Sequence, residues 1–123
     1  MFNVTKTTTD SASKYRINGY NNPTLTVYRG QTYTFTINSG VGSGHPFWIK
    51  TTQTTGTGDA YNTGVTGNGA IGGQTITWTV DIDAPGTLYY NCENHTADRG
   101  IITVLDREPA NVNVNLFWSE AQA

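Results

Sequence analysis

Three side chains in this sequence combine one thiol with two imidazoles, and they account for every cysteine and histidine of the chain. Cys92 is the only cysteine, and His95 follows it by three residues. The other histidine, His45, lies 47 residues before Cys92 in the segment Gly-His-Pro-Phe-Trp. A thiolate binds soft or borderline metal ions, and imidazole suits copper and zinc. The three donors therefore predict one mononuclear metal centre.

The elements that must position these donors are expected to be strands. Residues 31–38 and 75–80 alternate threonine with aromatic or β-branched apolar side chains, which is typical of half-buried strands. Residues 24–28, 88–92 and 100–105 complete the clearest set, and Asn-Pro, Arg-Gly and Ala-Pro-Gly turns separate them. No window has a helical period. The pattern predicts an all-β domain, namely an antiparallel β-sandwich.

Alternation along these strands predicts where two of the donors point. Cys92 shares a strand face with Leu88, which is an expected core residue. His45 shares a face with Phe47 and Ile49 in the strand that follows it. Both donors are therefore expected on inner faces, near strand ends. A buried histidine beside a buried cysteine needs a shared proton or a metal.

The donor spacing resembles that of the cupredoxin family. The carrying motifs are Gly-His-Pro-Phe and Gly-Thr-Leu-Tyr-Tyr-x-Cys-x-x-His, followed by Gly-x-Ile, and the resemblance covers residues 15–105. The chain looks closest to cupredoxin-like domains of marine microbial and phage proteins. The resemblance implies a Greek-key β-sandwich with a mononuclear copper site at one end. It also implies that His45, Cys92 and His95 are the equatorial copper ligands.

One position departs from the family pattern. The family carries an axial methionine six residues after the cysteine, where this chain has Asp98, and its only methionine is Met1. Asp98 could bind the metal as a hard oxygen ligand, or it could form an ion pair with Arg99 or Lys50. The carbonyl of Gly44 is another candidate oxygen donor. A carboxylate ligand would favour Cu(II) over Cu(I) and lower the reduction potential.

The chain is expected to divide into three parts. Residues 1–14 are predicted to be a polar N-terminal arm, with residues 5–13 either flexible or an edge strand, and residues 15–105 to be the cupredoxin-like domain. The glycine-rich residues 56–73 are expected to form a loop that is functional or mobile. Residues 106–123 form an extension in which three apolar residues alternate with asparagine, namely Val112, Val114 and Leu116. This candidate extra strand would pack on the sandwich or bridge subunits of a homo-oligomer.

Composition excludes several functional classes. A net charge of −2 gives no reason to expect nucleic acid as a partner, and no run of about 18 apolar residues predicts a membrane span. The first residues lack the apolar region of a signal peptide. Charged residues make up only 13%, which fits an extracellular or virion protein. No Ser-His-Asp arrangement or phosphate-binding loop is present, so a non-enzymatic role is expected.

These observations favour a copper protein that transfers one electron to or from an unknown redox partner. Two alternatives remain at this stage. The first is a metal-free cupredoxin fold that serves as a structural or interaction module in a virion or surface assembly. The second is an open copper site that binds a small molecule, with Asp98 as a ligand or base.

Overall fold

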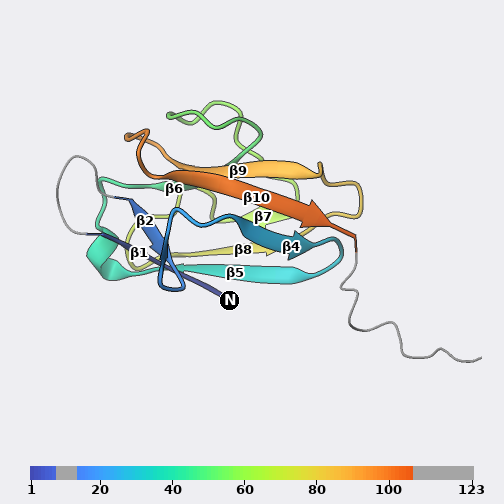
Figure 1. Cartoon of the computed structure of the whole chain (residues 1–123), viewed down its shortest axis with the longest axis horizontal. Helices are drawn as coiled ribbons and strands as arrows, with labels where there is room; N and C mark the ends of the chain where they lie inside the picture. Colours follow the sequence, from blue (N-terminus) through green and yellow to red (C-terminus); the bar gives the residue numbers. More distant parts are fainter. Residues whose placement is uncertain (8–13, 107–123) are drawn as a thin grey trace, which may run out of the picture.

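Two facing sheets build the molecule, as Figure 1 shows. The computed structural model describes residues 1–7 and 14–106. Within this part the first sheet has the order β3-β2-β1-β5-β8-β7, comprising Tyr20–Asn21, Tyr15–Ile17, Phe2–Lys6, Thr32–Ile37, Thr75–Thr79 and Val65–Thr66. The second has the order β4-β10-β9-β6, comprising Leu25–Tyr28, Arg99–Leu105, Thr87–Cys92 and Phe47–Lys50. A 3-10 turn, Ser39–Val41, is the only helical element described.

The predicted all-β sandwich is confirmed, and the alternation seen in the sequence explains its core. In β8 the apolar residues Ile76 and Trp78 are buried while the three threonines that alternate with them are exposed. The same rule places Leu88, Tyr90 and Cys92 of β9 on the inner face. The largest side chains buried between the sheets are those of Trp78, Tyr15, Tyr90, Phe35 and Phe47.

The expected purely antiparallel arrangement is wrong for two strand pairs. β1 runs parallel to β5, with Phe2 opposite Phe35, and β10 runs parallel to β4, with Val104 opposite Val27. The cause is the course of the chain. The chain crosses from the second sheet to the first between β4 and β5. Neither of these strands is therefore joined to its parallel partner by a short turn, and each pairs with a strand that is distant in sequence and runs in the same direction. Both sheets are therefore mixed.

The N-terminal residues differ from the polar arm expected for residues 1–14. β1 (Phe2–Lys6) lies inside the first sheet, between β2 and β5, and Val4 is fully buried. Phe2 stacks on Phe35 with ring centroids 4.8 Å apart. The polar composition hid a short alternation in which two apolar residues, Phe2 and Val4, share one face. The packed sandwich therefore begins at Phe2 and not at Tyr15.

The glycine-rich loop is held against the edge of the second sheet. The side chain of Asn68 accepts a hydrogen bond from the backbone N–H of Ile49 at 2.8 Å and donates to the Ile49 carbonyl at 3.0 Å, as a neighbouring strand would. The ammonium group of Lys50 is buried under the loop and donates to the carbonyls of Thr54, Thr55 and Gly56. These contacts fix the loop on the sheet that carries Cys92.

The remaining expectations concern a membrane span and the C-terminal extension. No helix among the described residues is long and apolar enough to cross a membrane. The predicted strand with Val112, Val114 and Leu116, and the oligomer contact assigned to it, lie outside the described residues. The C-terminal strand and the oligomer contact therefore stay predictions.

Candidate metal centre

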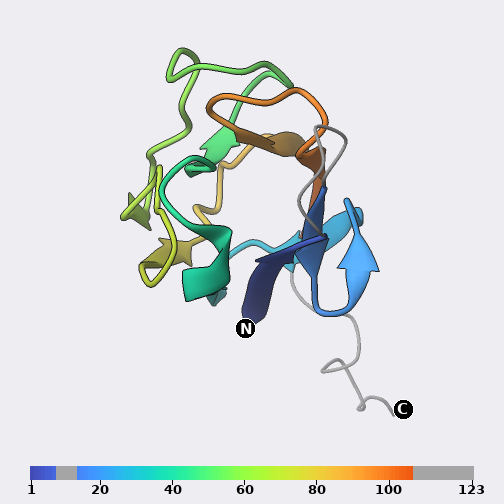
Figure 2. The same cartoon turned by 90° about the vertical axis from the view of Figure 1, so that its left-hand side faces the viewer.

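All four residues singled out from the sequence lie at one end of the sandwich, where β10 begins on the left of Figure 1. His45 lies just before β6, and Cys92 is the last residue of β9. His95 and Asp98 come from the loop that joins β9 to β10. Antiparallel pairing of β6 with β9 puts Phe47 opposite Cys92, so the segment carrying His45 lies over the thiol. Figure 2 shows how the loops converge at this end.

The donor atoms are close enough to share one ion. The Nδ1 atoms of His45 and His95 each lie 3.6 Å from the Sγ atom of Cys92. Asp98 Oδ2 lies 2.9 Å from His45 Nδ1. One donor atom from each of the four residues lies within 4.8 Å of the others. With metal–nitrogen bonds near 2.0 Å and metal–sulfur bonds near 2.3 Å, such spacings suit a single transition-metal ion.

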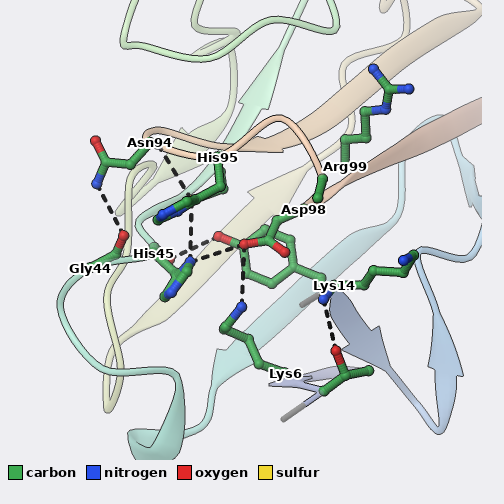
Figure 3. A network of polar contacts seen from close by, with 12 residues as sticks. Lys6, Lys14, Gly44, His45, Asn94, His95, Asp98 and Arg99 are labelled. Atoms are coloured by element: carbon green, nitrogen blue, oxygen red, sulfur yellow. Dashed lines mark hydrogen bonds and ion pairs between the residues drawn. The ribbon is translucent and has the colours of Figure 1, made fainter. Parts of the chain in front are cut away.

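Backbone hydrogen bonds hold this arrangement in place. The N–H of Cys92 donates to the Asp98 carbonyl at 2.8 Å, which closes the loop between β9 and β10. The N–H of Asn94 points at Cys92 Sγ, 3.4 Å away. The Asn94 side chain donates to the carbonyl of Gly44 at 3.0 Å and so ties the two ligand segments together (Figure 3). The carbonyl oxygen of Gly44, considered above as a candidate metal ligand, thus accepts a hydrogen bond from Asn94.

The cluster is buried on one side and open on the other. Cys92 and Asp98 are fully buried, whereas His45 is partly exposed and His95 is exposed. The two imidazole rings stack with centroids 4.4 Å apart and an angle of 29° between their planes. The thiolate and carboxylate positions are therefore shielded from water, and the His95 ring forms the solvent-facing edge.

Asp98 is paired differently from either partner expected from the sequence. Its Oδ2 atom lies 3.4 Å from Lys6 Nζ and 2.9 Å from His45 Nδ1. Lys50 is directed to the carbonyls of Thr54, Thr55 and Gly56 instead. Figure 3 shows the Arg99 side chain extending away from Asp98. The carboxylate is therefore turned into the cluster, with Lys6 as its cationic neighbour.

The second oxygen of Asp98 supplies the clearest test of whether these residues fit a metal. Asp98 Oδ1 is buried and has no hydrogen-bond partner among the described residues. A buried carboxylate oxygen without a donor is costly unless a cation compensates it. A thiol, two imidazole nitrogens and an under-satisfied carboxylate in one cluster are a donor set that fits copper or zinc.

Burial shifts the acid–base properties of two of the donors. Burial raises the pKa of the Cys92 thiol above its usual range, although backbone N–H groups of Asn94 and His95 oppose that shift. Burial lowers the pKa of the His45 imidazole, as does the charge of Lys6, while Asp98 acts in the opposite direction. His45 is therefore neutral and able to bind a metal near neutral pH, whereas Cys92 must lose a proton to do so.

Two residues near the cluster were missed from the sequence. Lys6 reaches Asp98 from the end of β1, and the buried hydroxyl of Tyr15, in β2, donates to the His45 carbonyl at 2.8 Å. Burial raises the pKa of Tyr15 well above its usual range, and the neighbouring Cys92 adds to that shift. Lys6 lies in the expected arm, whereas Tyr15 is the first residue of the expected domain. The alternation of Phe2 with Val4, whose face Lys6 shares, was the signal that could have placed Lys6.

The sandwich and its His-Cys-His-Asp cluster define a cupredoxin-like domain. No family model and no curated protein matches the sequence. Among solved structures the chain is similar to the copper protein rusticyanin, with a TM-score of 0.53 and 23% identity over 83% of this chain and 76% of that chain. A second rusticyanin structure, of substituted protein, gives a TM-score of 0.52 at 26% identity over 83% and 75%.

Multicopper oxidases are also similar, but more weakly. The 2F4 variant of the multicopper oxidase McoA from the hyperthermophile Aquifex aeolicus gives a TM-score of 0.45 at 20% identity. The match covers 90% of this chain but only 27% of the oxidase. This chain therefore corresponds in length to about one quarter of that enzyme, and the likeness has no bearing on activity.

Proposed function

We propose that this chain is a mononuclear copper protein that carries one electron at a time. The observation that supports it most directly is the convergence of His45 Nδ1, Cys92 Sγ and His95 Nδ1, with both S–N distances at 3.6 Å. Two imidazoles and a thiolate are the donor set of copper electron-transfer sites. The similar fold of rusticyanin, which is described as a copper protein, agrees with this donor set.

The chain's own residues would hold the metal ligands rigidly and would expose one ligand, His95, to a redox partner. Bound copper would supply the one-electron couple. The hydrogen bonds from Cys92 to Asp98 and from Asn94 to Gly44 fix the ligand segments before any metal arrives, so little protein rearrangement accompanies a change of oxidation state. The exposed ring of His95 offers the short path from the centre to a partner surface.

Within this proposal Asp98 replaces the axial thioether as an oxygen donor. Its support is the buried Oδ1 atom, which has no partner among the described residues, and the position of the carboxylate beside His45. A carboxylate adds negative charge at the metal and favours Cu(II). A low potential for a copper protein of this class follows from that assignment.

An electron carrier is proposed here in preference to an oxidase. Within the described residues there is one cluster of potential metal ligands, and it uses every histidine and cysteine of the chain. A multicopper mechanism would need further histidines, which this sequence does not contain. A metal-free interaction module is the rival proposal, and metal content separates the two.

Metal analysis of purified protein tests the proposal. Protein produced without added metal should bind one equivalent of Cu(II) and acquire an intense visible absorption from charge transfer between thiolate and copper. Reduction should bleach that band, and reoxidation should restore it. Protein that takes up no copper would support the metal-free module. Tight zinc binding that copper cannot displace would instead indicate a closed zinc site of the same donors.

A further inference from the structure

Lys6 places a positive charge beside the candidate metal centre from a strand that contributes none of its ligands. Its Nζ atom lies 3.4 Å from Asp98 Oδ2, and the Lys6 side chain is only 11% exposed against 0% for Asp98. Lys6 is the last residue of β1, whose position between β2 and β5 is fixed on both sides. The ammonium group is therefore held near Asp98 by the fold and is shielded from most of the solvent.

The contacts of Asp98 divide its two oxygens. Oδ2 contacts both Lys6 Nζ and His45 Nδ1, whereas Oδ1 has no hydrogen-bond partner among the described residues. A metal at His45 Nδ1 would remove the donor at that nitrogen, and the Lys6 ammonium would remain as the neighbour of Oδ2. Lys6 thus determines how much of the carboxylate's negative charge the metal experiences.

A charge count shows why this matters for a copper couple. The thiolate of Cys92 and the carboxylate of Asp98 bring two negative charges to a mostly buried cluster, and Lys6 reduces the net charge to one. Cu(I) then completes a neutral centre. Without Lys6, the same Cu(I) centre would carry a net negative charge in an environment that stabilises charge poorly. Removing Lys6 should therefore penalise Cu(I) more than Cu(II).

We propose that Lys6 is a positioning residue that sets the reduction potential by compensating the charge of Asp98. This inference rests on the proposed copper function and adds a residue that sets the reduction potential of the copper site. Other cations near the loop do not fit that role. Arg99 extends away from the cluster in Figure 3, and the Lys50 ammonium is occupied by loop carbonyls.

The first experiment is a redox titration of copper-loaded Lys6→Met. The ratio of Cu(II) to Cu(I) affinity should move about tenfold toward Cu(II), which is a fall of about 59 mV in midpoint potential for a one-electron couple. Lys6→Arg retains the charge and should stay near the wild-type value. Arg99→Met removes an equal charge one residue from Asp98 and should also leave the potential near that value. Lys6→Gln replaces Lys6→Met if the latter does not fold.

A coupling experiment separates action through Asp98 from a general charge effect. In an Asp98→Asn background, Lys6→Met should shift the midpoint clearly less than in the wild-type background. An equal shift in both backgrounds, or no shift in the wild-type background, overturns the inference and leaves the copper function standing. Wild-type protein that binds no copper overturns the proposed function and this inference with it.

Discussion

His45 Nδ1 lies 2.9 Å from Asp98 Oδ2 and 3.6 Å from Cys92 Sγ, so one nitrogen faces both the carboxylate and the sulfur atom. At 2.9 Å a proton must lie between the nitrogen and the carboxylate oxygen. A metal that takes Nδ1 displaces this proton, and the imidazole can carry a proton on Nε2 instead. The metal-free cluster is thus held together by a hydrogen bond at the place where a metal would bind.

Metal uptake should release a proton from the thiol. Because burial raises the pKa of Cys92, the thiol is protonated near neutral pH and must ionise to bind a metal. The apparent metal affinity should therefore rise about tenfold per pH unit between roughly pH 6.5 and 8. Competition with a chelator of known pH dependence measures this slope. Since the lowered pKa of His45 keeps that imidazole neutral in this range, it adds no second proton.

The same shifts fix the pH dependence of the metal-free fold. A raised thiol pKa stabilises the folded state below the unfolded thiol's pKa, near 8.5, and this contribution is lost as the pH rises through and above that value. A lowered His45 pKa acts at the other end, where stability falls as the pH drops below about 6.5. Urea unfolding between pH 5 and 10 should therefore show a maximum between these limits. A flat profile would contradict both shifts.

Cys92→Ser should remove the visible absorption of copper-loaded protein without unfolding it. A hydroxyl is a poor ligand for a soft metal, so the charge-transfer band has no source. Serine is close in size to cysteine and can still accept the N–H of Asn94, which now points at Sγ. Absorption spectra of both proteins at equal copper content, with circular dichroism as the folding check, measure this. A retained band would place the chromophore at another residue.

How much of this site could be predicted depends on how local its signals are. Cys92 and His95 are three residues apart in one loop, and alternation from Leu88 gives the inward direction of the thiol. The inward direction of His45 could be predicted because it shares a strand face with the apolar residues Phe47 and Ile49, which are both buried. The family resemblance implied that the three donors share one site, but the pairing of β6 with β9 that brings them together was not predicted.

The remainder of the site could not be predicted because it depends on long-range packing. Lys6 is 92 residues from Asp98, and parallel pairing of β1 with β5 leaves no turn or hairpin signal in the sequence. Adjacent Arg99 was the more obvious partner for Asp98, yet strand alternation turns successive side chains to opposite faces. Proximity in sequence was therefore a poor guide to ion pairing at the start of β10.

Removing buried apolar groups from β1 tests whether that strand is part of the folded domain. Val4 is fully buried, and Val4→Ala should cost about 2 kcal/mol of unfolding free energy through lost burial and a residual cavity. Asn3→Ala is the matched control, since the Asn3 side chain is exposed, and should change stability by less than about 0.5 kcal/mol. Urea denaturation of the three proteins decides. Equal midpoints would restore the polar N-terminal arm expected from the sequence.

Asp98→Met places the family's thioether where this chain has a carboxylate. If Asp98 is a ligand, the substitution removes a negative charge at the metal, so Cu(I) gains relative to Cu(II) and the midpoint potential rises. The rise should exceed about 59 mV, the equivalent of a tenfold change in relative affinity. Because Asp98→Met also removes the ion pair with Lys6, the double variant Lys6→Met/Asp98→Met is a second test, and its potential should also lie above the wild-type value.

The control for this measurement is Asp83→Met. Asp83 is exposed in the turn between β8 and β9, at the end of the sandwich opposite the cluster. The substitution therefore removes an equal charge at a site remote from the metal ligands. Its potential should match that of the wild type, since an exposed charge at that separation is screened by salt. If Asp98→Met gives a midpoint within a few tens of millivolts of both, Asp98 is not a ligand. The carboxylate would then act as the ion-pair partner of Lys6 and, in the metal-free protein, as the hydrogen-bond partner of His45.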